Sequence, residues 1–217
     1  MRNTFNDDLD SITNTLVAMA QLVQKATKDA TTSLLTADLD MAEKVIKQDD
    51  QIDAMQHELD AKIIVLLATQ QPVASDLRAL VTSLRISADL ERMGDMAHHI
   101  AKLARLHYPA TAVPPESSLT IEEMGRVAGL IIEKVAKIIS DRNLNDAQQL
   151  AIDDDEMDKL HRKLIQSLIS KDWPHGAESA IDLTLLGRYY ERSADHAVSI
   201  ARRIYFLVTG SYQQSKD

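Results

Sequence analysis

Acidic side chains recur four residues apart at four places in this 217-residue chain. The segments ERMGDMA (residues 91–97) and ERSADHA (191–197) each hold one such pair, and DDQIDAM (49–55) and DDEMDKL (154–160) each hold another. On a helix, residues i and i+4 are neighbours on one face, where like charges destabilise by roughly a few tenths of a kcal/mol. The eight carboxylates are Asp49, Asp53, Glu91, Asp95, Asp154, Asp158, Glu191 and Asp195.

A cluster of these carboxylates would form if two neighbouring antiparallel helices each presented one pair. In such a cluster, mutual repulsion raises the pKa values of the carboxyl groups unless a cation neutralises their charges. All-oxygen ligation suits hard cations such as Mg²⁺, Mn²⁺, Ca²⁺ or ferric iron. The spacing by itself is also compatible with a solvated acidic face on each helix.

Prolines and glycines divide the chain into a few long elements. The chain has only 5 prolines and 6 glycines, about half of average usage. Because a proline inside a helix costs about 3 kcal/mol of stability, the prolines mark helix ends. The prolines lie at 72, at 109, 114 and 115, and at 174, and weaker breaks occur near Asp38, a plausible N-cap, and Asn143. We therefore expect six long helices, over residues 6–35, 39–69, 75–107, 120–142, 146–171 and 177–209, with a linker at 108–119.

Apolar residues on the third and sixth expected helices follow a 4-3-4-3-4 spacing, which predicts one buried face on each. The positions are Ile86, Leu90, Met93, Ala97, Ile100 and Ala104, and, 100 residues later, Leu186, Tyr190, Ser193, Ala197, Ile200 and Ile204. This repeat and the short connections predict an all-α fold of two pseudo-symmetric three-helix bundles, residues 1–108 and 119–217. The paired carboxylates point away from the apolar faces.

Charge and composition exclude several classes of function. With 33 acidic and 24 basic side chains, the formal net charge is -9, which argues against a nucleic-acid binder. The chain has no cysteine, so disulfides and thiolate metal sites are excluded. The first ten residues lack the apolar segment of a secretory signal, and the longest strongly apolar run, 63–68, is too short to span a bilayer. We expect a cytoplasmic protein with no direct membrane insertion.

These motifs are similar to those of the PhoU family of phosphate-signalling proteins. The resemblance runs from about Phe5 to Phe206 and includes the connection from Pro72 to Arg78, PVASDLR. It implies two three-helix bundles whose eight paired carboxylates bind metals, iron among them, and the oxygen ligands leave manganese, magnesium and calcium as further candidates. It also implies a non-enzymatic negative regulator of the phosphate-starvation response and of phosphate uptake. Such a regulator links the ATPase of a phosphate ABC transporter to a sensor histidine kinase, and we expect a homodimer.

Two alternatives remain open from the sequence. The first is an accessory protein of a low-affinity phosphate permease, which the same fold would serve. The second, from another class, is a metalloenzyme that uses the carboxylate clusters for hydrolysis or oxidation. The absence of a recognisable nucleophile or general base argues against the enzyme.

Basic residues near the motifs have simpler interpretations than ligand binding. Arg78, Arg85 and Arg92 recur every seven residues and could contact an acidic partner or phosphate. Ion pairing with the acidic second helix is the simpler expectation. Three histidines adjoin the motif carboxylates and are interpreted as surface histidines rather than ligands: His98, His99 and His196.

Overall fold

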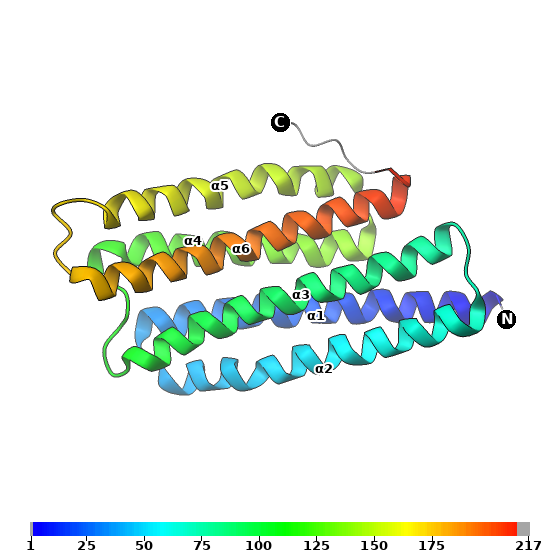
Figure 1. The fold of residues 1–217 in the computed structure, drawn as a ribbon, viewed down its shortest axis with the longest axis horizontal. Coiled ribbons are helices and arrows are strands. Elements are labelled where there is room, and N and C mark those ends of the chain that lie inside the picture. The colour runs from blue at the N-terminus through cyan, green and yellow to red at the C-terminus, as the bar shows by residue number, and fades with distance from the viewer. Residues whose placement is uncertain (1, 212–217) are drawn as a thin grey trace.

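A computed structural model describes residues 2–211, and this part of the chain is built from six long helices without any strand (Figure 1). The helices are α1 (Arg2–Thr36), α2 (Leu39–Gln70), α3 (Ser75–His107), α4 (Pro115–Asp141), α5 (Leu144–Leu168) and α6 (Gly176–Thr209). The predicted all-α fold is confirmed. Among the described residues, no helix is long and apolar enough to cross a membrane. The outer ends of the two expected bundles, residue 1 and residues 212–217, lie outside the described range.

Side-chain caps fix the starts of α2 and α5. Asp38 accepts a hydrogen bond from the backbone N–H of Met41 at 2.9 Å, as its predicted N-cap role requires. Asn143 accepts in the same way from the N–H groups of Asn145 and Asp146, at 2.9 and 3.3 Å. Because Asn143 supplies this cap, α5 begins earlier than the expected residue 146.

The proline-rich connection is shorter than expected. The fourth helix begins at Pro115 rather than at Thr120, because proline at the first helical position lacks only an N–H that would have no helical partner anyway. Thr111 donates from Oγ1 to the carbonyl of Leu34 at 3.0 Å, and Val113 is buried. The connection is therefore packed against the end of α1.

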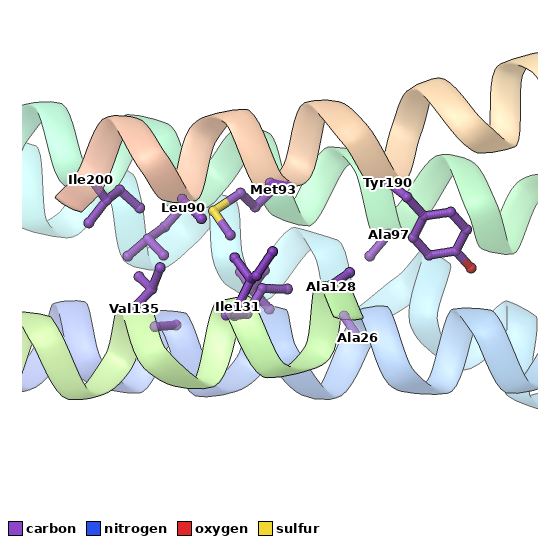
Figure 2. Close-up of a cluster of buried hydrophobic side chains, with 14 of the residues drawn as sticks. Ala26, Leu90, Met93, Ala97, Ala128, Ile131, Val135, Tyr190 and Ile200 are labelled. Carbon is purple, nitrogen blue, oxygen red and sulfur yellow. The ribbon is translucent and has the colours of Figure 1, made fainter. Parts of the chain in front are cut away.

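The two halves of the chain pack side by side (Figure 1). Within each half the helices run up, down and up, and between the halves α1 packs against α4 and α3 against α6, which leaves α2 and α5 at the outer edges. The predicted apolar faces of α3 and α6 are buried at every position. Figure 2 shows Leu90 and Met93 of α3 and Ile200 of α6 near Ile131 and Val135 of α4. The halves therefore share one hydrophobic core.

Polar contacts across α3 and α6 fix how the two halves are aligned. The buried Asp89 accepts hydrogen bonds from Arg203 Nε at 2.6 Å and from His196 Nδ1 at 3.1 Å. A second pair joins His107 Nε2 to Asp182 Oδ2 at 2.9 Å. The interpretation of His196 as a surface histidine was thus wrong, because its ring belongs to the junction between the halves.

Candidate metal centres

The first predicted quadruplet comes together on α2 and α3. Asp49 and Asp53 of α2 and Glu91 and Asp95 of α3 are all half-buried. They are close enough that the charges of Asp53 and Asp95 act on Asp49, and the charges of the other three act on Glu91. We refer to these four residues as the first quadruplet.

Burial and mutual repulsion make the charged state of this quadruplet unfavourable. Burial is the main cause that raises the pKa of Asp49, and the charges of Asp53 and Asp95 add to it. The pKa of Glu91 is raised as well, first by burial and then by Asp95. A cation bound here would remove this cost.

Gly94 faces α2 where the two helices pack together. A Cβ atom added at Gly94 would lie 3.0 Å from Cδ1 of Ile52 and 3.4 Å from Oδ1 of Asp49. A side chain here would press on Ile52, so glycine leaves room for α2 beside the α3 carboxylates. The second half has Ala194 at the equivalent position.

His98 belongs to the first centre, although the sequence analysis interpreted it as a surface histidine. Its Nδ1 lies 2.5 Å from Oδ2 of Asp49, so the imidazole N–H donates to that carboxylate. The Nε2 atom of His98 and Oδ1 of Asp53 are buried and have no hydrogen-bond partner among the described residues. The sequence did contain an indication of this role. His98 follows Asp95 by three residues, and this spacing places the imidazole one helical turn beyond the carboxylate on the same face of the helix.

Arg92 partly neutralises the first quadruplet. Its NH1 lies 2.8 Å from Oδ2 of Asp95, and its Nε lies 3.4 Å from Oε2 of Glu91. The expectation that Arg92 pairs with the second helix was therefore wrong, because the carboxylates on its own helix are nearer. Its side chain is 58% exposed, so it can turn into solvent when a cation takes its place.

The second predicted quadruplet lies on α5 and α6 and is more open. It consists of Asp154 and Asp158 of α5 and Glu191 and Asp195 of α6, and Asp158 and Asp195 are exposed. Burial, followed by the charges of Asp158, Asp195 and Glu191, raises the pKa of Asp154 to about 6. Arg188 forms an ion pair with Glu191. No imidazole takes the place of His98, because the equivalent residue is Val198.

The donor atoms of both quadruplets fit a hard cation. Each quadruplet supplies carboxylate oxygens only, which is the ligand type that Mg²⁺, Ca²⁺ and Mn²⁺ prefer. The buried oxygen of Asp53 that lacks a donor is a ready acceptor for such an ion. Within residues 2–211, no three acidic or histidine side chains already converge as a formed metal site. Metal binding therefore requires these side chains to turn toward a common point.

The fold and the two quadruplets define a class of protein: two related three-helix bundles with a common core, each with an acidic face on a helical hairpin. Comparison with known proteins agrees with this description. The model of the PhoU domain matches residues 16–104 and again residues 121–204. The chain belongs to the PhoU family.

Relatives and solved structures are similar over almost the entire chain. The "Phosphate-specific transport system accessory protein PhoU homolog 2" of Mycobacterium tuberculosis is 41% identical over 212 residues, which cover 98% of this chain and 100% of that protein. Homolog 1 of Mycobacterium leprae is 41% identical over 214 residues, covering 99% and 96%. The crystal structure of PhoU from Pseudomonas aeruginosa has a TM-score of 0.88 at 28% identity, covering 95% of this chain and 100% of that one.

Proposed function

We propose that this protein is an accessory protein of a phosphate-specific transport system that represses phosphate uptake and the phosphate-starvation response. The observation that carries the proposal is the 41% identity, over 98% of the chain, to a protein with that name. The shared core and the two matched halves support it, because the similarity extends to the whole architecture.

The proposed mode of action is that of an adaptor without catalytic turnover. The protein acts in the cytoplasm as a homodimer and binds both the ATPase of the phosphate transporter and a sensor histidine kinase. Six long helices with acidic and apolar exposed surfaces suit protein contacts. An accessory role at a low-affinity phosphate permease is the alternative within this fold.

The two quadruplets are proposed to hold hard metal ions in this adaptor. The first ion is held by Asp49, Asp53, Glu91 and Asp95, and the second by Asp154, Asp158, Glu191 and Asp195. Iron, manganese, magnesium and calcium are the candidate metals. A bound cation neutralises the carboxylates and links the two helices of each hairpin, so it stabilises the surface that partners meet.

Deletion of the gene tests the regulatory role. We expect phosphate-starvation genes to be expressed in phosphate-rich medium in the deletion strain, and repression to return with the intact gene. Unchanged expression in the deletion strain would contradict the proposal. Repeating the deletion in a strain without the ABC transporter separates the alternatives, because an accessory protein of the low-affinity permease would still change phosphate uptake there.

A turnover assay tests the absence of catalysis. The metal-loaded protein should neither hydrolyse phosphoesters nor consume oxygen above the rate of the free metal ion. Turnover that disappears in the double variant Glu91→Gln, Asp95→Asn would instead establish a metalloenzyme.

A further inference from the structure

The start of α3 and the end of α6 lie at the same end of the molecule (Figure 1), and residues of both helices line a groove there. Its volume is about 630 Å³, within the range of pockets that bind ligands or side chains of a partner. The first turns of α3 supply most of its lining, including Leu77, Arg78, Val81 and Arg85, and Phe206 of α6 lies across from them.

Among residues 2–211, the two arginines of this groove have no ionic partner. Neither Arg78 nor Arg85 forms an ion pair with any residue in the described part of the chain, and Arg85 is exposed. This contradicts the expectation that both pair with the acidic second helix. Two neighbouring arginines on one groove give it a positive charge, which contrasts with the formal net charge of -9 of the whole chain.

Arg78 also contributes to the fold. Its guanidinium lies 5.8 Å from the ring centroid of Phe206. A Cβ atom added at Gly210, the left-handed residue that ends α6, would lie 2.5 Å from its NH1. Arg78 thus lies against the carbonyl end of α6, where a positive charge is favourable. Arg85 makes no hydrogen bond, ion pair or cation–π contact with the residues that the structure describes.

Exposed apolar side chains occur on the hairpin formed by α2 and α3, and two of them, Leu77 and Val81, line the groove with the arginines. Within residues 64–81, five large hydrophobic side chains are exposed, and their exposed fractions run from 37% at Val81 to 73% at Val73. Apolar patches of this kind on soluble proteins commonly mark interaction sites. The five are Ile64, Val65, Val73, Leu77 and Val81.

We propose that this groove, with its apolar residues Leu77 and Val81, docks an amphipathic helix of the transporter ATPase, one that carries two carboxylates seven residues apart beside its apolar face. Arg78 and Arg85 are two helical turns apart, about 10 Å along the axis, which matches that carboxylate spacing. The apolar residues favour such a helix over a free anion. The inference rests on the proposed accessory function, which supplies the partner.

The docking surface occurs once in each chain despite the internal repeat. One hundred residues further on, Glu178 takes the place of Arg78 and Leu185 the place of Arg85. Ile181 and Leu185 are exposed apolar residues in that region, but the two arginine charges of the first half are missing there. An acidic partner helix should therefore bind the first half of the molecule and not the second.

Charge reversal at Arg85 tests the proposal with the full-length protein. The probe is the purified ATPase subunit of the phosphate transporter from the same organism, immobilised for an equilibrium binding measurement. We expect Arg85→Glu to raise Kd about tenfold or more, because a complementary charge pair becomes a repulsive one. The matched control is Arg105→Glu at the other end of α3, where the arginine is also exposed and without an ion pair; its Kd should stay within about twofold of the parent.

A second pair of variants tests the apolar contribution. Leu77→Gln should raise Kd severalfold, whereas Leu106→Gln, on the same helix and 74% exposed, should not. Both leucines are exposed, so thermal melting should show that all four variants fold like the parent.

The possible results lead to different conclusions. If the parent binds the ATPase and both Arg85→Glu and Leu77→Gln bind equally well, the docking surface is wrong and the accessory function stands. If the parent does not bind the ATPase at all, both proposals fail. Competition by inorganic phosphate at millimolar concentration would show an anion site instead. A change of oligomeric state in Arg85→Glu, measured by light scattering, would show a contact between copies of this chain. Either of these last two results overturns the docking proposal.

Discussion

Nδ1 of His98 and Oδ2 of Asp49 lie 2.5 Å apart and join α3 to α2 inside the first quadruplet. The second quadruplet has no such contact, since Val198 occupies the equivalent position. The internal repeat has therefore produced two centres with the same carboxylates and different surroundings. One is half-buried with an imidazole that orients a carboxylate, and the other is more open and consists of carboxylates alone.

This difference predicts two classes of metal site. An outer partner that orients a ligating group typically contributes a factor of about 10–100 in metal affinity, so the first centre should bind Mn²⁺ more tightly than the second. The variant His98→Val should bring the two affinities together, whereas His57→Val, which removes an exposed histidine of α2, should change neither. Titration calorimetry of the metal-free proteins measures this. Identical isotherms for His98→Val and the parent would show that the imidazole has no role in metal binding.

Removal of two carboxylates should separate the two centres. The double variant Glu91→Gln, Asp95→Asn should bind about half of the parent's metal, because the second centre lies in the other half of the chain. Metal at 100 times its Kd adds about 2.7 kcal/mol to the free energy of unfolding for each site, and the variant should lose one such contribution. Without metal it should be as stable as the parent or slightly more, because repulsion is relieved.

Elemental analysis and melting temperatures with and without Mn²⁺ measure both effects. If the parent protein holds no metal and melts at the same temperature in either condition, the metal sites are wrong. The eight carboxylates then form the solvated acidic faces that their spacing also allows.

The fold was predictable because its signals are local. Proline positions and the apolar periodicity that includes Leu90 and Tyr190 require no knowledge of distant contacts, and both apolar faces are buried as expected. The start of α4 was misplaced because Pro115 was taken as a helix breaker, although the first helical position tolerates it.

The surroundings of the carboxylates were less predictable because they depend on how the helices are aligned. Asp89 meets Arg203 across 114 positions of sequence, and no local pattern specifies that α3 and α6 pack with this register. His98 reaches Asp49 through the packing of α3 against α2, in which Gly94 faces Ile52. The pairing of carboxylates within each half followed from the repeat, whereas the difference between the two centres did not.

The raised pKa of Asp154 predicts a stability that depends on pH. Its pKa is about 6 in the folded protein, compared with an ordinary value of 3.8, so between these pH values the folded state holds a proton that the unfolded state has lost. Stability therefore falls as pH rises through this window. The loss is on the order of 1 kcal/mol, once screening by solvent at this half-exposed group is allowed for.

The variant Asp154→Asn should remove this loss. In metal-free buffer at pH 7.5 it should melt roughly 2–4 °C above the parent, and near pH 4 the two should melt together because Asp154 is then protonated. Asp50→Asn, at an exposed position of α2 without an ion pair, serves as the control and should show no such dependence. Equal stability of Asp154→Asn and the parent at pH 7.5 would mean that the second quadruplet does not strain the fold.

The junction between the two halves should depend on Asp89. Its buried carboxylate accepts from Arg203 at 2.6 Å and from His196 at 3.1 Å, so Asp89→Ala leaves the guanidinium and the imidazole without their partner. They are partly exposed and can recover some hydration, which limits the expected loss to about 2 kcal/mol of unfolding free energy. For a chain of this size, this corresponds to a fall in melting temperature of roughly 4–8 °C. Asp10→Ala, at an exposed position of α1 without an ion pair, should change stability by less than about 0.5 kcal/mol. If Asp89→Ala melts no lower than Asp10→Ala, the shared apolar core alone holds the halves together and the Asp89 contacts contribute nothing to their association.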